Sequence, residues 1–199
     1  MKIIQPKVEL VDFIDADEVF KKIERCGRVC YQSEPKGEPE KFVRMLIKRG
    51  HESVLEHVSL TFHIICDRAI QNELVRHRLA SFSVESTRYC AYGELSVIKP
   101  PDIRPKTVQG DDWLMAIRDA ERYYEHMLNY GYHPEDARSI LPLCLKSELY
   151  MTTNLREWRH ILKLRTSKHA HPQMQFIAGK ILDTFKEKLP VIVEDIQHD

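Results

Sequence analysis

The sequence predicts an α+β fold, in which a small antiparallel or mixed sheet is surrounded by several α-helices in one domain over residues 1–199. Three observations support this prediction. Apolar residues follow helical spacing through most of the chain, a few segments are rich in strand-forming residues, and no repeat, low-complexity tract or linker divides it. A chain of 199 residues is long enough to bury a substantial core as one domain.

The N-terminal half predicts helices with one clear strand. Asp15 or Asp17 can cap a first helix that runs toward Tyr31. The elements expected next are a loop over Gln32–Pro39, a helix over Glu40–Arg49 that stops at Gly50, an alternating strand over Val58–Cys66, a helix over Arg68–Val75 and an extended or irregular segment over Ser81–Tyr92.

The C-terminal half predicts longer helices. Prolines mark Pro100–Gly110 as a loop, after which Asp111 and Asp112 open a long helix that ends at Gly131. The elements expected next are a helix from Pro134 to near Pro142, a strand over Leu143–Thr153, a helix capped by Asn154 and a last helix from Pro172 to near Pro190.

Composition limits the classes of function. Thirty basic residues balance thirty acidic ones, so no overall field attracts nucleic acid or anionic lipid. No apolar run is long enough for a signal peptide or a membrane span, so we expect no membrane association. Five cysteines without a Cys-x-x-Cys pair suggest neither a disulfide framework nor a zinc site. These features favour a reduced, cytoplasmic compartment.

Glycine gives a further exclusion. The seven glycines are too widely spaced for a Gly-x-Gly-x-x-Gly turn or a Walker loop. If the protein binds a nucleotide, side chains must do much of what glycine-rich loops do elsewhere. This directs attention to the arginines.

The first arginine-rich segment runs from Glu73 to Arg88. It combines Arg76, His77, Arg78 and Arg88 with interleaved hydroxyl groups, and guanidinium and hydroxyl groups both bind phosphate well. The alternatives are a solvated basic helix end followed by a polar turn, or a nucleic-acid patch, although no wider basic field supports the latter. Composition alone leaves these alternatives open.

The second arginine-rich segment is the helix that follows Asn154. With about 100° per residue, Arg165 lies within the apolar stripe, where a charge is costly unless it has a partner or ligand. It can also extend outward at the helix end. The opposite face carries Arg156, Arg159, His160 and Lys163, which are either a solvated charge run or contacts to anionic ligands or another subunit.

The sequence His51-Glu52-x-x-x-Glu56-His57 raises the question of zinc. Two histidines six residues apart point in different directions from a regular helix, unlike the His-Glu-x-x-His spacing of zinc proteases. We therefore predict no metal site.

The spacing of the first segment carries more information than its composition. Arg76-His77-Arg78, seven residues and then Ser86 resembles the signature of flavin-dependent thymidylate synthases. The resemblance extends in order through Glu135–Pro142, Asn154–His160, Leu164-Arg165 and Pro172–Met174, and with His51–Ser53 it covers about residues 51 to 174.

The resemblance implies roles for individual residues. Arg165 matches the catalytic arginine. The residues implied to contact FAD are Ser53, Arg76, His77, Arg78, Val84, Asn154, Arg156 and His160. Those implied to contact deoxyuridylate (dUMP) are Glu73, Arg76, Glu85, Ser86, Thr87, Arg88, Arg138 and Arg165. His51 is expected near the flavin ring, where folate could stack.

The family resemblance also implies a reaction. It predicts reductive methylation of dUMP to dTMP, with 5,10-methylenetetrahydrofolate as carbon donor, NADPH as reductant through FAD, and a homotetramer that shares its active sites. Our hypothesis is that Arg165 stabilises negative charge at N3 of uracil, whereas Ser86 positions substrate because no histidine–acid pair marks it as a nucleophile. The alternative is a non-enzymatic nucleic-acid-binding protein.

Two positions depart from the family pattern. Glu73 stands where glutamine is common, and its charge repels a phosphate unless it binds sugar or an arginine. Val84 stands where Glu or Gln is usual, so only its backbone can contribute a polar contact.

Overall fold

A computed structural model describes residues 1–30, 32–35 and 37–197. The chain divides into two compact units, each described separately below. Unit 1 comprises residues 1–7, 64–76 and 83–149, and unit 2 comprises residues 8–63, 77–82 and 150–199. The α+β class is confirmed, whereas the single domain over residues 1–199 stays a prediction.

A four-stranded sheet has the order β2-β3-β6-β4. Its strands are β2 (Lys7–Leu10), β3 (Ser59–Asp67), β6 (Lys146–Asn154) and β4 (Ala80–Val84). Along β3 and β6 the residue numbers run in opposite directions: the backbone N–H of Leu155 donates to the carbonyl of Val58, and the hydroxyls of Thr61 and Thr152 lie 3.0 Å apart. These strands are therefore antiparallel, and both predicted strands are confirmed.

Unit 1 packs helices and a small parallel strand pair around its own core. Its remaining elements are β1 (Lys2–Ile4), α3 (Arg68–Leu74), β5 (Ser96–Ile98), α4 (Val108–Asn129), α5 (Pro134–Ala137) and the short 3₁₀ helix η2 (Arg138–Ile140). Strand β1 pairs in parallel with β5. Val97, Ile117, Tyr124 and Leu145 are buried together and hold α4 against β5.

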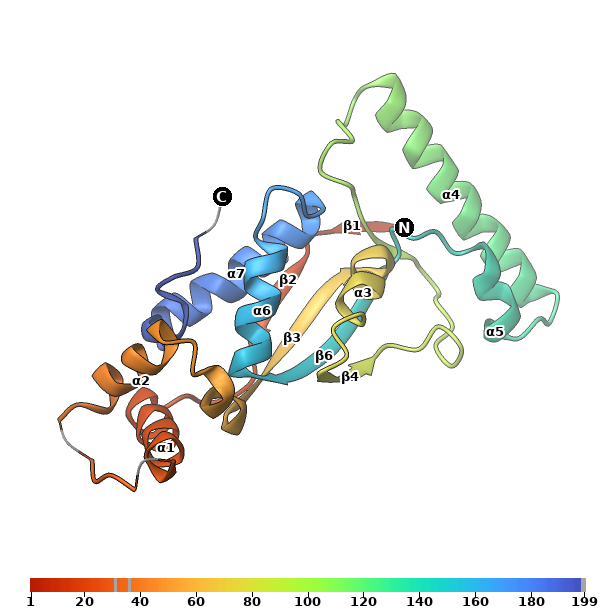
Figure 1. Cartoon of the computed structure of the whole chain (residues 1–199). Coiled ribbons are helices and arrows are strands. Elements are labelled where there is room, and N and C mark those ends of the chain that lie inside the picture. The colour runs from red at the N-terminus through yellow and green to blue at the C-terminus, as the bar shows by residue number, and fades with distance from the viewer. Residues whose placement is uncertain (31, 36, 198–199) are drawn as a thin grey trace. The chain divides into compact units, whose positions relative to one another are not determined.

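Unit 2 is mainly helical (Figure 1). Its helices are α1 (Ala16–Val29), α2 (Pro39–Lys48), the 3₁₀ helix η1 (Glu52–His57), α6 (Leu155–Arg165), α7 (Pro172–Lys188) and α8 (Pro190–Val193). Trp158 of α6 is fully buried between Phe62 of β3 and Phe185 of α7, and its indole N–H donates to the Leu60 carbonyl at 3.1 Å. This contact fixes α6 on β3.

Local capping signals account for most helix starts. The side chains of Asp15 and Asn154 accept hydrogen bonds from the backbone N–H groups of Glu18 and Glu157, as expected for caps of α1 and α6. Gly50 and Gly131 follow α2 and α4 with positive φ angles of 72° and 87°. Tyr31 and Lys36, at the expected end of the first helix and in the loop after it, lie outside the described residues.

Some boundaries and elements differ from the prediction. Helix α4 begins at Val108 rather than Asp111, because Thr107 caps it by accepting from the Gly110 N–H at 3.1 Å. A Cβ atom at Gly110 would lie 2.1 Å from the Arg104 carbonyl oxygen, so glycine here permits close packing and does not mark a loop. The short strands β1, β2 and β5 and the helix α8 were not predicted.

No helix among the described residues is long and apolar enough to cross a bilayer.

Candidate active site

In unit 1, four of the predicted substrate residues lie together: Ser86, Thr87 and Arg88 on the loop after β4, and Arg138 at the start of η2. The Arg88 backbone N–H donates to the Ser86 hydroxyl at 3.3 Å, and Arg88 Nε donates to Glu135 at 2.6 Å. Arg138 donates from Nε to the Glu135 carbonyl and from Nη1 to the Thr87 hydroxyl, at 3.1 and 3.3 Å. Two guanidinium groups and two hydroxyl groups thus form one cluster, which we call the arginine cluster.

The two arginines of the cluster are open to solvent, whereas Thr87 is buried at 4% exposure. The side chain of Arg88 is 55% exposed and Arg138 is also exposed, so both retain donors for a ligand. The hydrogen bond and the charge of Arg88 lower the pKa of Glu135. The Glu135 carboxylate therefore remains ionised and holds the Arg88 side chain against α5. The arrangement suits a small dianion such as a phosphate monoester.

The other predicted residues of unit 1 have surroundings of their own. Arg76 lies two residues after the end of α3 and is exposed, and its backbone N–H donates to the carbonyl of Glu73 at 3.3 Å. Val84 is the half-buried last residue of β4. Glu85 directs both carboxylate oxygens to Lys146 and Tyr92.

Unit 2 contains a pocket of about 590 Å³ at the N-terminal half of α6. Its lining residues are Glu52, Glu56, Leu79, Asn154, Arg156, Glu157, Arg159, His160 and Lys163. Three of the predicted flavin contacts, Asn154, Arg156 and His160, therefore share one cavity. Arg156 donates to Glu56 at 2.5 Å across the pocket wall, and Asn154 uses its side-chain oxygen to cap α6.

His77 lies between Glu157, which lines this pocket, and Arg165. Arg165 Nε donates to His77 Nε2 at 3.1 Å, so that ring nitrogen carries no proton. The neutral ring then has its proton on Nδ1, which faces a carboxylate oxygen of Glu157 at 3.5 Å. Burial, together with the charge of Arg165, lowers the pKa of His77 to about 4. His77 is therefore a neutral acceptor that orients the Arg165 guanidinium.

The lowered pKa of His77 predicts acid-sensitive stability. Because the unfolded chain takes up this proton near pH 6.5 and the folded chain only near pH 4, the contribution is complete above pH 6.5 and is lost as pH falls toward 4. We expect a loss of about 2 to 3 kcal/mol in the free energy of unfolding over that range. Urea unfolding of flavin-free protein at about pH 7 and about pH 4.5 measures it.

H77N should remove this part of the pH dependence, whereas H169N, at an exposed histidine of the same unit, should retain it. An unchanged pH dependence in H77N would show that His77 is not the group responsible.

His77, Glu157 and His160 also place three possible metal ligands within 4.8 Å of one another. No second such group occurs in the part of the chain that the structure describes. The Arg165 guanidinium at His77 Nε2 opposes a cation there and fixes the proton on the other ring nitrogen. We therefore assign no metal to this group.

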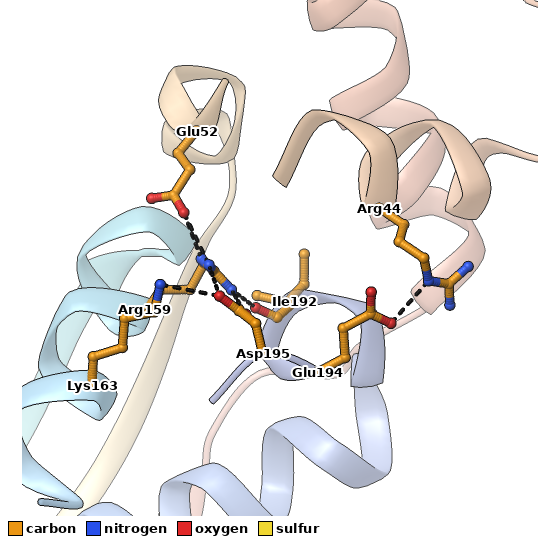
Figure 2. A network of polar contacts seen from close by, with 7 residues as sticks. All are labelled: Arg44, Glu52, Arg159, Lys163, Ile192, Glu194 and Asp195. Atoms are coloured by element: carbon orange, nitrogen blue, oxygen red, sulfur yellow. Dashed lines mark hydrogen bonds and ion pairs between the residues drawn. The ribbon is translucent and has the colours of Figure 1, made fainter. Parts of the chain in front are cut away.

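Arg159 was placed on a face expected to be either a solvated charge run or contacts to anionic ligands or another subunit, and the first alternative is wrong for this residue, because it is 1% exposed. Figure 2 shows its guanidinium between Glu52 of η1, Asp195 and the Ile192 carbonyl. The bonds to Glu52 measure 2.9 and 3.1 Å and those to Asp195 measure 2.7 and 2.9 Å. We call these contacts the Arg159 network. It joins α6 to η1 and to the segment after α8.

Residues 9–191 match the model of the family described as Thy1, thymidylate synthase complementing protein. This chain belongs to the Thy1 family. The match covers both units, including α5, α6 and the loop after β4.

Individual relatives of this Thy1 chain agree. A flavin-dependent thymidylate synthase from Pyrococcus furiosus is 34% identical over 154 residues, covering 75% of this chain and 63% of that protein. A probable flavin-dependent thymidylate synthase of Mycobacterium phage L5 is 34% identical over 200 residues, covering 92% and 81%. The chain spans less than two thirds of the Pyrococcus relatives, at 63% and 62% of their lengths.

A solved structure is also similar to this Thy1 chain. It is the UMP/dUMP methylase PolB from Streptomyces cacaoi bound with 5-Br dUMP, with a TM-score of 0.83, 26% identity and coverage of 98% of this chain and 96% of that one.

The remaining predicted residues of the Thy1 chain are exposed. His51 precedes η1 and Ser53 lies within it, while Arg78 follows His77. The structure thus brings Asn154, Arg156 and His160 together, and separately Ser86, Thr87, Arg88 and Arg138. The roles of all these residues stay predictions.

Proposed function

We propose that this Thy1 chain is a flavin-dependent thymidylate synthase, which methylates dUMP reductively to dTMP. In this proposal FAD is the cofactor, 5,10-methylenetetrahydrofolate donates the one-carbon unit and NADPH is the reductant. One observation carries the proposal: three residues predicted from the family resemblance to contact flavin line a single pocket.

The basic side chains of that pocket fit a flavin nucleotide, and two of the three glutamates that also line it, Glu52 and Glu56, are paired with Arg159 and Arg156. Arg156, His160 and Lys163 offer donors to a diphosphate, as expected in a chain without glycine-rich phosphate loops. Leu79 is 73% exposed and offers apolar surface to an aromatic ring. When bound, FAD supplies hydride transfer, and the protein binds and orients the reactants.

The arginine cluster fits the substrate phosphate. Arg88 and Arg138 supply charge, and the Ser86 and Thr87 hydroxyls supply neutral contacts at the same loop. A phosphate bound here must compete with Glu135 for Arg88. Anions that bind Arg88 more weakly than phosphate does are therefore disfavoured.

Arg165 is proposed to act on the uracil ring. Its guanidinium is half-buried and oriented by the neutral His77 ring. A fixed positive charge stabilises negative charge that develops at N3 of uracil, which increases the electron density available at C5. No cysteine nucleophile is required in this scheme.

The assembly and compartment are also proposals. Because one small chain offers few surfaces for dUMP, FAD, NADPH and folate, we propose a homotetramer with shared active sites. Five free cysteines are compatible with a reducing cytoplasm.

The proposed reaction predicts release of hydrogen from C5 of dUMP. We expect a yellow protein that absorbs at about 450 nm, as bound flavins do. We also expect that release of the C5 hydrogen requires both NADPH and methylenetetrahydrofolate. UMP should be assayed in parallel, because the PolB relative is named for both nucleotides. A flavin-loaded protein that releases no C5 hydrogen from dUMP would contradict the proposal, whether or not it acts on UMP.

The alternative function, nucleic-acid binding, predicts a different outcome of these measurements. It predicts a colourless protein whose affinity for DNA or RNA falls steeply with salt concentration. The balanced net charge of the chain disfavours that outcome.

A further inference from the structure

The loop between Glu85 and Tyr92 carries Ser86, Thr87 and Arg88 and is held at both ends. The Glu85 backbone N–H donates to the Glu148 carbonyl of β6 at 2.9 Å. The Tyr92 backbone N–H donates at 3.3 Å to the hydroxyl of Tyr124, a fully buried residue of α4. Three members of the arginine cluster, Ser86, Thr87 and Arg88, therefore lie on a loop that is hydrogen-bonded to β6 at one end and to α4 at the other.

The side chains of the same two end residues also meet. The Tyr92 hydroxyl donates to one carboxylate oxygen of Glu85 at 2.8 Å, and Lys146 donates to the other oxygen at 2.7 Å. Lys146 also donates to Glu148 at 2.8 Å. Glu85 and Lys146 are 18% and 21% exposed, so these charge-assisted bonds are largely shielded from water.

The protonation states support this arrangement. Burial and the hydrogen bond to Glu85 raise the pKa of Tyr92, which therefore remains a donor through neutral pH. Burial alone would lower the pKa of Lys146, but its hydrogen bonds to Glu148 and Glu85 raise it overall. Tyr92 and Lys146 therefore both remain donors to Glu85 at neutral pH.

We propose that Glu85, Lys146 and Tyr92 are positioning residues that brace the phosphate-binding loop, and that Glu85 is not itself a substrate ligand. We call these three residues the Glu85 brace. Glu85 precedes Ser86 directly, and the Ser86 carbonyl accepts from the Cys90 N–H at 3.0 Å, so a shift of Glu85 displaces the whole turn. The inference rests on the proposed function, because it assumes that dUMP phosphate binds here.

The first test is Y92F in the flavin-loaded protein. Loss of one partly buried hydrogen bond should raise both the KM and the Kd for dUMP about fivefold to tenfold, and leave kcat within about twofold. The control is Y130F, the same chemical change at a residue of unit 1 that is 78% exposed, which should leave both constants unchanged.

A double-mutant cycle separates a brace from a ligand. If Tyr92 acts through Glu85, Y92F should have no further effect in an E85A background. If Glu85 instead binds the sugar directly, E85A should weaken dUMP binding, whereas Y92F alone should leave the KM and Kd for dUMP unchanged. That result would overturn the inference.

A second readout tests the phosphate specifically. Y92F and E85A should weaken binding of dUMP but not of deoxyuridine, which lacks the phosphate, whereas a general loss of folding weakens both. Equal losses for the two ligands would overturn the proposal. Failure of the wild-type protein to bind dUMP would instead refute the proposed function, so the two failures are distinguishable.

Discussion

Replacing Arg165 with alanine is expected to reduce turnover of dUMP about 100-fold to 1,000-fold, the usual loss when one oriented donor is removed from a developing anion. Arg165 is absent from the lining of the α6 pocket, and its Nε is held by His77. Flavin should therefore stay bound at near wild-type occupancy. The measurements are kcat from C5 hydrogen release and flavin content from absorbance.

A control variant and a second measurement make this experiment more specific. K168A removes a nearby exposed cation of the same unit and should leave turnover unchanged, which separates the role of Arg165 from general electrostatics. R165A should also raise the pKa of His77, because the positive charge of Arg165 is one cause of its lowered value. Loss of flavin together with activity would show that Arg165 is a cofactor-binding residue.

The helix that carries Arg165 could be predicted because its signals are local. Asn154 is followed by an apolar stripe that includes Leu155, Trp158 and Ile161, and each of these three side chains is buried as that spacing predicts. The helix cap at Asn154 depends only on that residue and the three residues that follow it. Local spacing also placed Arg156 and His160, which line one pocket.

Long-range partners could not be predicted in this way. Arg159 lies opposite the apolar stripe, where solvated or ligand-binding side chains were expected, yet its acceptors Glu52 and Asp195 belong to the same chain, 107 and 36 residues away in the sequence. The family resemblance implied a dUMP contact for Glu85, but nothing in the sequence indicated that its carboxylate meets Lys146, 61 residues away. No periodicity or local motif records such pairings, which depend on the tertiary fold.

The Arg159 network gives the second large expected effect, on stability. R159M keeps an apolar stem but leaves Glu52, Asp195 and the Ile192 carbonyl without their shared donor. Breaking a fully buried pair costs about 3–5 kcal/mol. The carboxylate side chains of Glu52 and Asp195 are 24% and 44% exposed and regain some water. We therefore expect a loss of about 2–3 kcal/mol in the free energy of unfolding.

Urea unfolding of flavin-free protein should measure this loss, with R156M as the matched control. Arg156 lies on the same helix and pairs with Glu56, but both side chains are about half exposed, at 52% and 46%, so its removal should cost about 0–1 kcal/mol. Equal losses for R159M and R156M would show that the Arg159 network adds nothing beyond a surface ion pair.

Acid pH provides an independent check of the same network. The hydrogen bond from Arg159 is the largest cause that lowers the pKa of Asp195, from 3.8 to about 2. This contribution is complete above pH 3.8 and is lost as pH falls toward 2, because the carboxylate then becomes protonated in the folded state. The difference in stability between wild type and R159M should therefore narrow over that range. A difference that stays constant down to about pH 2 would mean that the loss in R159M comes from packing and not from the ion pair with Asp195.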